Sequence, residues 1–151
     1  MSSIVEAKPK NSPMISRNRD FILRAEALIA KQPDALFKDE AAPLNHLFAD
    51  GVYCRQIFLR AGVLVTSSIH KRDYFSFVMQ GKLVVFSDYE GESYIEAPKI
   101  ILAPAGVKRV IYTVTDTIWC TVHPNPDELR DPDELRDKYV VDSYEDLMIG
   151  I

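Results

Sequence analysis

Short apolar runs rich in β-branched and aromatic residues make up most of the chain after Leu44. Turn residues separate them, among them Ala61-Gly62, Gln80-Gly81 and Pro104-Ala105-Gly106. The predicted strands are Tyr53 to Leu59, Val63 to His70, Tyr74 to Met79, Leu83 to Ser87, Ser93 to Glu96, Ile100 to Ala103, Lys108 to Tyr112 and Thr117 to His123. Evenly spaced strands without intervening helices favour an antiparallel sandwich or barrel over a parallel α/β sheet.

A helical period comes before the strands, from Asn18 to Lys31. Its apolar residues fall at i, i+4, i+7 and i+8, which is one face of a helix: Phe21, Ala25, Leu28 and Ile29. Pro33 ends the pattern. We expect this helix to lie on the barrel, after a polar arm over residues 1–16. The chain then divides into an N-terminal arm and helix (1–43), a β-barrel (44–124) and an acidic extension (125–151).

The extension contains two identical hexapeptides in tandem, Pro126 to Asp131 and Pro132 to Asp137. Each has an N-cap residue before it, a proline in the first turn and a glutamate that completes a capping box, so we expect two short helical turns. Between Asp127 and Asp146, nine acidic and three basic residues give a net charge of -6. Such a charge run favours a duplicated surface spacer, and an acidic docking tail is the alternative.

Composition limits the cellular setting and the partners. A length of 151 residues with 47% apolar content suits one domain with a real core. The two cysteines, Cys54 and Cys120, make no disulfide framework, and their apolar neighbours predict that they are buried. The start of the chain lacks the features of a signal peptide, and no apolar run approaches the roughly 20 residues that cross a bilayer. We therefore expect a soluble, cytoplasmic protein, and the lack of a basic stripe argues against duplex nucleic acid as a partner.

Two stretches have the spacing of paired motifs. The first places Gly62, Ser68-Ile69-His70, Tyr74 and Gly81 in one frame, and the second places Pro98, Pro104-Ala105-Gly106, Arg109 and Thr113. This frame resembles the two signatures of the cupin superfamily, the RmlC-like jelly rolls. Together with the patterns above, the resemblance implies an all-β, cupin-type antiparallel jelly-roll barrel with an N-terminal helix and a short helical acidic C-terminal extension. It also implies a homodimer or larger homo-oligomer, because cupin-like barrels commonly pair through their sheets.

The same resemblance implies where a metal would sit. Cupins hold Fe, Mn, Ni or Zn with His, His, Glu and His, and this chain has Ser68, His70, Tyr74 and Arg109 at those four positions. Ser68 is a poor ligand, Tyr74 must lose a proton with a pKa near 10, and Arg109 is a permanent cation. The sequence therefore predicts no metal and no other cofactor. The alternative metal pair is His70 with His123.

Several short phrases are similar to the small cupin-like proteins of tailed phages. They are Gly51-Val52-Tyr53-Cys54-Arg55, Ile69-His70-Lys71, Gly106-Val107-Lys108-Arg109-Val110, and Thr117-Ile118-Trp119 through His123-Pro124. That group implies no defined activity. For a phage-encoded chain, the expected location is the host cytoplasm or the virion.

A barrel mouth without a metal can still bind a ligand. Arg109 offers a rigid fork of donors for a carboxylate or phosphate, Lys108 can add charge, and His70 and Tyr74 can donate or accept. The predicted ligand-binding residues are His70, Tyr74, Arg109, Ser68, Lys108, Trp119 and His123. We therefore predict a non-catalytic protein that binds a small anionic ligand, a nucleotide or a metabolite.

Several of these residues have a plainer interpretation. Arg109 can pair with Asp73 or Asp116 and seal the barrel. Trp119 fits the core better than a stacking platform, and alternation alone leaves open which face of its strand points inward. His46, at the start of the barrel, is assigned to the surface.

Two other functions are alternatives to binding alone. One is a degenerate cupin enzyme, either a metal-dependent oxygenase or a metal-free isomerase with His70 and Tyr74 as acid and base. The other is a structural virion or assembly component that uses the barrel as a scaffold. The chain has no nucleophile elbow, Gly-rich phosphate loop or paired-carboxylate signature, so we predict no catalytic residues.

Overall fold

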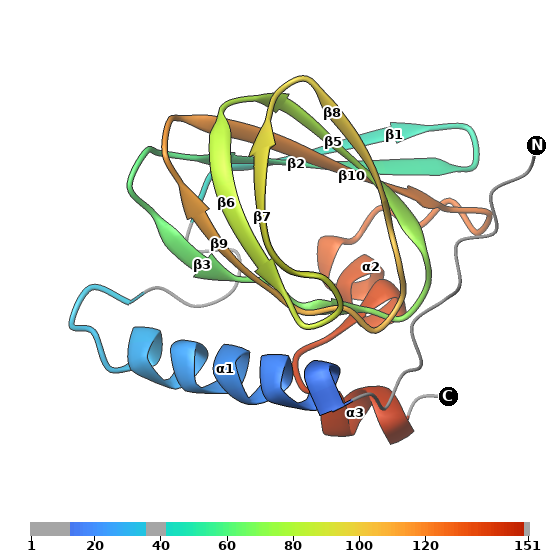
Figure 1. The fold of residues 1–151 in the computed structure, drawn as a ribbon. Coiled ribbons are helices and arrows are strands. Elements are labelled where there is room, and N and C mark those ends of the chain that lie inside the picture. The colour runs from blue at the N-terminus through green and yellow to red at the C-terminus, as the bar shows by residue number, and fades with distance from the viewer. Residues whose placement is uncertain (1–12, 36–41, 150–151) are drawn as a thin grey trace, which may run out of the picture.

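A computed structural model describes residues 13–35 and 42–149, in which two antiparallel sheets face each other as a barrel (Figure 1). The five-stranded sheet has the order β1-β2-β10-β5-β8, the four-stranded sheet β3-β9-β6-β7, and β11 pairs with β4. The strands are β1 (Leu44–Ala49), β2 (Val52–Leu59), β3 (Leu64–Thr66), β4 (Ile69–His70), β5 (Tyr74–Gln80), β6 (Lys82–Ser87), β7 (Gly91–Glu96), β8 (Lys99–Ala103), β9 (Arg109–Thr113), β10 (Thr117–Pro124) and β11 (Val140–Val141). The helices are α1 (Pro13–Ala30), α2 (Pro132–Tyr139) and α3 (Tyr144–Ile149). The predicted all-β jelly-roll barrel with helices at both ends is confirmed, whereas most of the expected N-terminal arm lies outside the described residues.

The apolar core occupies one half of the barrel interior. Trp119 of β10 is 7% exposed and packs there with inward-facing side chains of both sheets: Val78, Leu83, Val85 and Ile111. Burying each such side chain stabilises the fold by roughly 1.5–3 kcal/mol. Because side chains alternate along a strand, Thr121 and His123 share the inward face of β10 with Trp119. Sequence alternation left open which face of this strand points inward, and the structure shows that it is the face of Trp119.

The glycines of the motif frame occupy turns that require them. Gly62, Gly81 and Gly106 all have positive φ angles, as the frame predicts. Gly81 is the most constrained, since a Cβ atom there would lie 2.5 Å from Oγ1 of Thr117 and 2.7 Å from the carbonyl oxygen of Asp116. Any side chain at position 81 would push the β5–β6 turn away from the start of β10.

Helix α1 packs against β3, β6 and β9, as expected, through a face that overlaps the predicted one, since Phe21 contacts Phe86 and Ile29 is half-buried. Its buried residues are Ile15 and Ile22, whereas Leu28 is 62% exposed. Arg19 and Glu26 lie on the buried face as well, because positions 15, 19, 22 and 26 follow the helical period. These two charged residues form ion pairs with Asp88 and Lys108 of the barrel. The spacing of apolar residues alone does not predict such a mixed apolar and charged interface.

The two identical hexapeptides adopt different conformations. The second forms α2, which Asp131 caps by accepting a hydrogen bond from the backbone N–H of Asp133 (2.8 Å). The first is a loop in which Glu128 has a φ of +53°. There the side chain of Asn125 bonds both the N–H and the carbonyl of Leu129, at 3.1 and 2.9 Å, and this closes the loop. The prediction of a helical turn is therefore confirmed for the second copy and wrong for the first.

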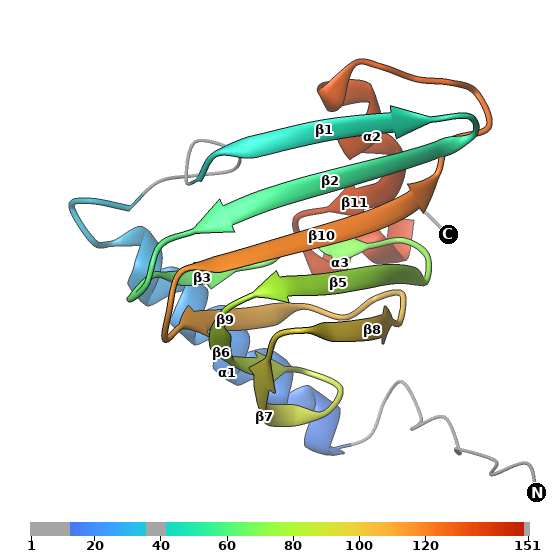
Figure 2. The ribbon, with the colours of Figure 1, turned by 90° about the horizontal axis from the view of Figure 1, so that it is seen from above.

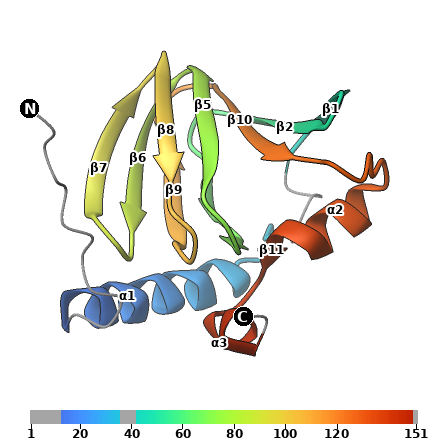
Figure 3. The same ribbon diagram turned by 90° about the vertical axis from the view of Figure 1, so that its right-hand side faces the viewer.

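The extension packs on the barrel rather than acting as a spacer, which corrects the expectation for its second copy. Leu135 is 1% exposed and Tyr139 is 8% exposed, and both pack against Tyr53 of β2. Strand β11 then pairs with β4, and the backbone N–H of Lys71 bonds the carbonyl of Tyr139. Figures 2 and 3 show α2, β11 and α3 gathered along one end of the barrel. The apolar residues of an otherwise acidic segment explain this docking.

The outer face of the five-stranded sheet is uncharged. Its outward-facing residues are Asn45, Leu47, Ala49, Val52, Cys54, Gln56, Phe58, Phe75, Phe77, Met79, Ile100, Leu102, Ile118, Cys120 and Val122. Leu102, Ile100 and Met79 are 65%, 63% and 61% exposed. Cys120 is buried and Cys54 half-buried, and burial raises the pKa of the Cys54 thiol. This face is far more apolar than the surface of most monomers.

Candidate anion-binding site

Four of the predicted ligand-binding residues meet at one end of the barrel, which we call the mouth cluster: His70, Tyr74, Arg109 and His123. His70 comes from β4, Tyr74 from the start of β5 and His123 from the end of β10. Ring centroids are 3.7 Å apart for His70 and Tyr74 and 5.2 Å apart for His70 and His123. Tyr139 of α2 stacks on His123 at 4.8 Å, so the extension covers the mouth.

Arg109 brings a buried positive charge into this cluster. Arg109 is only 8% exposed, and its Nη1 donates a hydrogen bond to the hydroxyl of Tyr74 at 3.2 Å. Over residues 13–35 and 42–149, no carboxylate forms an ion pair with it. Asp73 and Asp116, the expected partners, accept hydrogen bonds from loop backbone amides instead. The sealing role considered for Arg109 is therefore absent from the described contacts.

Both histidines of the cluster are neutral at pH 7. Burial is the largest cause that lowers the pKa of His70, and repulsion from His123, Arg109 and Arg55 adds to it in that order, so that the pKa falls to about 2. Burial also lowers the pKa of His123 to about 4, with a smaller contribution from Arg55. The arginines that lower these pKa values, Arg109, Arg55 and Arg136, are permanent cations. Nδ1 of His70 is buried and has no hydrogen-bond partner in the described part of the chain.

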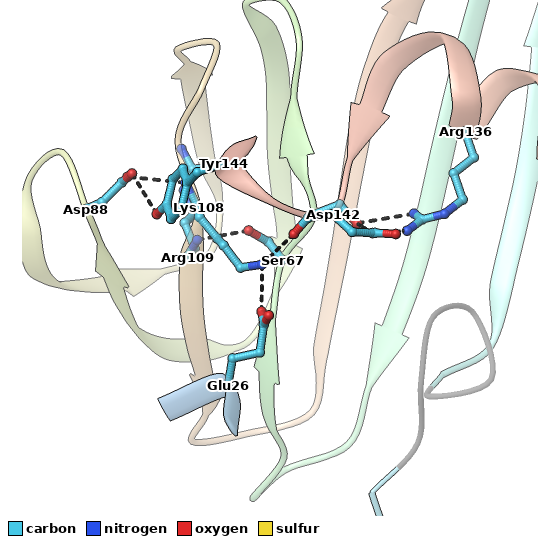
Figure 4. A network of polar contacts seen from close by, with 9 residues as sticks. Glu26, Ser67, Asp88, Lys108, Arg109, Arg136, Asp142 and Tyr144 are labelled. Carbon is cyan, nitrogen blue, oxygen red and sulfur yellow. Dashed lines mark hydrogen bonds and ion pairs between the residues drawn. The ribbon is translucent and has the colours of Figure 1, made fainter. Parts of the chain in front are cut away.

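The other three predicted residues lie outside the mouth cluster. Ser68 stands at the rim, where its Oγ accepts a hydrogen bond from Nη1 of Arg136 at 3.2 Å. Lys108 extends toward α1, and its Nζ lies 2.6 Å from Oε2 of Glu26 and 2.9 Å from the carbonyl of Asp142 (Figure 4). Trp119 belongs to the apolar core.

Sequence reasoning missed several residues around the cluster. Tyr53 lies opposite His123 in the β2–β10 register, and Arg55 lies opposite Thr121. Strand alternation could have found both, had the inward face of β10 been known. His46, expected on the surface, is half-buried, and its Nδ1 lies 2.7 Å from the hydroxyl of Tyr53. Nothing in the sequence pattern indicated that Tyr139 would reach the mouth.

The residues at the cupin ligand positions do not fit a metal. Arg109 places its guanidinium beside Tyr74, and Ser68 bonds Arg136. His70 and His123 remain as a pair, and the described residues contain no group of three His, Cys, Asp or Glu that could hold an ion.

The opposite end of the barrel carries an open depression of about 510 Å³. It is lined by loop and strand-end residues: Ala61, Gln80, Gly81, Lys82, Glu96, Ala97, Val114, Thr115 and Asp116. None of the predicted ligand-binding residues contributes to it. Lys82 and Glu96 form an ion pair at 3.7 Å within this depression, so their charges compensate each other.

Comparisons with known proteins agree with this fold. Salicylate 1,2-dioxygenase from Pseudoaminobacter salicylatoxidans, in adducts with gentisate, is 14% identical with a TM-score of 0.52, over 82% of this chain and 34% of that chain. KdgF from Halomonas sp. is 12% identical with a TM-score of 0.50, over 66% and 88%. An RmlC-like cupin family protein with a double-stranded β-helix fold from Methanocaldococcus jannaschii is 16% identical with a TM-score of 0.45, over 62% and 91%. No family model and no curated protein matches the sequence.

The sheet order and these likenesses define the class: the chain has the cupin-type jelly-roll fold, with an N-terminal helix and short C-terminal helices. The structural similarity supports the fold, but at sequence identities of 12% and 14% no activity can be transferred from these proteins. Within the described residues, no helix has both the length and the hydrophobicity needed to cross a bilayer.

Proposed function

We propose that this chain is a metal-free cupin-type protein that binds a small anion at the mouth cluster without catalysing a reaction. Arg109 supplies the charge and two donors in a fixed plane, which suits a carboxylate or phosphate. Tyr74 and the neutral His70 lie beside it and supply further hydrogen bonds. For a phage-encoded chain, such binding would sequester a small molecule of the host.

One observation carries this proposal: a guanidinium that is nearly buried and has a phenol, but no described carboxylate, as its partner. Removing an ion from water costs several kcal/mol unless an opposite charge compensates. With His70 and His123 neutral, Arg109 carries the positive charge of the mouth cluster. A bound anion would supply the compensation that the described residues lack.

The alternative functions have weaker support. An isomerase would need His70 to exchange protons near neutral pH, and a pKa of about 2 leaves it a poor acid and a poor base there. A scaffold role is favoured by the mouth being covered by Tyr139. Detection of the protein in purified particles, with no anion binding in solution, would support the scaffold.

Titration calorimetry tests the proposal with inorganic phosphate, AMP, a sugar phosphate and several small carboxylates. We expect the wild-type chain to bind at least one of them, and Arg109→Gln to bind it at least about 10-fold more weakly, as expected for a lost charged hydrogen bond. Lys82→Gln at the opposite end is the matched control and should bind as the wild type does. Absence of heat with every anion, or equal affinity in Arg109→Gln, would contradict the proposal.

We further propose that the chain forms a homodimer through the uncharged outer face of the five-stranded sheet. A second copy supplies the same apolar surface. The outward-facing residues carry no charged side chain that could form ion pairs with a charged partner. Light scattering should give twice the chain mass of 17.1 kDa for the wild type and a single chain mass for Leu102→Glu. Leu28→Glu on α1 is the control, because Leu28 is similarly exposed. A monomeric wild type would contradict this arrangement.

A further inference from the structure

A second row of polar side chains lies one step deeper than the mouth cluster. The strand registers place Arg55, Thr121 and Ser76 side by side across β2, β10 and β5. All three positions face inward, because they alternate with outward-facing residues on the same strands. The row stands between the rings of Tyr74 and His123 above it and the apolar core below it.

The hydroxyls of this row have unused hydrogen-bonding capacity. Ser76 is 0% exposed and Thr121 is 9% exposed, and neither Oγ of Ser76 nor Oγ1 of Thr121 has a hydrogen-bond partner in the described residues. A buried hydroxyl without a partner is unfavourable, and native proteins keep few of them. Two adjacent ones, together with the unpartnered Nδ1 of His70, indicate a built site for polar atoms rather than scattered defects.

We propose that Ser76 and Thr121 form the inner half of the anion site and that the ligand is a small carboxylate bearing hydroxyl groups. This inference rests on the proposed function, since Arg109 would hold the carboxylate. Successive inward positions on one strand are roughly 7 Å apart, so a ligand that reaches from Arg109 to Ser76 needs only a few carbon atoms. Ser and Thr hydroxyls both donate and accept, which matches ligand hydroxyls at the inner end.

The surroundings argue against a nucleotide. Val78 and Trp119 close the interior just beyond the row, and Tyr139 covers the mouth on the other side. His70 and His123 are neutral, so their rings add no positive charge to that of Arg109. We therefore expect a short hydroxylated carboxylate rather than a nucleotide at this row.

The test compares hydroxylated and deoxygenated carboxylates in two proteins. Calorimetry measures glycerate, gluconate, propionate, hexanoate and AMP against the wild type and the double variant with Ser76→Ala and Thr121→Val, which removes both hydroxyls at nearly constant volume. In the wild type we expect glycerate or gluconate to bind at least 10-fold more tightly than its deoxygenated counterpart, and AMP not to bind. In the double variant that preference should fall below 3-fold while the deoxygenated acid keeps its affinity.

Thermal melting gives a second, independent readout. Removing hydroxyls that have no protein partner should leave the unfolding midpoint unchanged or raise it, and each single variant serves if the double variant fails to fold. A lower midpoint in both single variants overturns the inference, because the hydroxyls would then have structural partners. Equal affinity for hydroxylated and deoxygenated acids in the wild type, or tighter binding of AMP, also overturns it but leaves the proposed anion site in place. If no anion binds at all, the proposed function itself fails.

Discussion

Replacing Asp88 with asparagine is expected to lower the free energy of unfolding by about 3 kcal/mol, the upper end for hydrogen bonds to a charged group. Asp88 is 1% exposed, and its carboxylate accepts hydrogen bonds from Nε of Arg19 (3.3 Å), the hydroxyl of Tyr144 (2.9 Å) and the backbone N–H of Lys108 (3.2 Å). Burial and this carboxylate raise the pKa of Tyr144, so its hydroxyl stays protonated as a donor. Asparagine keeps the shape but loses the charge that orients all three donors.

Chemical denaturation followed by circular dichroism measures the change. Asp127→Asn is the matched control, since Asp127 forms an exposed pair with Lys138 at 3.0 Å and should matter little. A double-mutant cycle with Arg19→Gln should show coupling, because both residues act through the same contact. If Asp88→Asn is as stable as Asp127→Asn, then the carboxylate does not hold α1 and α3 to the barrel.

Acidification is expected to destabilise the protein well above the range in which carboxylates titrate. The unfolded chain takes up protons on His70 and His123 near pH 6.5, whereas the native pKa values are about 2 and about 4. The unfolded state therefore binds more protons, and stability falls as the pH decreases from about 6.5 to about 4. At pH 5 each histidine accounts for a loss of about 2 kcal/mol relative to pH 7, at 1.36 kcal/mol per pH unit.

Denaturation at several pH values between 5 and 6.5 measures this slope, in a window above the usual carboxylate pKa values. His123→Phe keeps an aromatic ring against Tyr53 and Tyr139 and removes one titrating group, so it should halve the slope. His70→Phe should do the same, and both together should leave little slope. A wild-type slope near zero would show that protons reach these rings in the native state.

The barrel could be predicted from the sequence because its physical signals are local. Alternating apolar residues define the strands, and turns such as the one at Gly81 admit no other residue. The orientation of α1 could not be predicted, since Arg19 and Glu26 lie on its buried face and their ion-pair partners on the barrel come much later in the chain. The fate of the two hexapeptides depends likewise on contacts with distant residues, such as the bond from the Gly51 N–H to Glu128.

The candidate site was predictable as far as the motif frame extends. The frame placed His70, Tyr74 and Arg109 together, and the structure brings them together. Lys108 precedes Arg109 in the chain but points to the other side of the strand, toward Glu26, which adjacency in a strand explains. Ser76, Thr121 and Tyr139 lie outside the frame, and only the strand register and the folding of the extension reveal them.

The pair of identical hexapeptides has a consequence for how such a chain can change over time. One copy is a loop closed by Asn125, with Leu129 half-buried against the cluster of Tyr53, and the other keeps its cap and the buried Leu135. A six-residue duplication at this point therefore lengthens the connection and leaves the docked helix intact. Apart from Leu129, the residues of the first copy are exposed, so we expect variants that differ in the number of repeats to share one barrel.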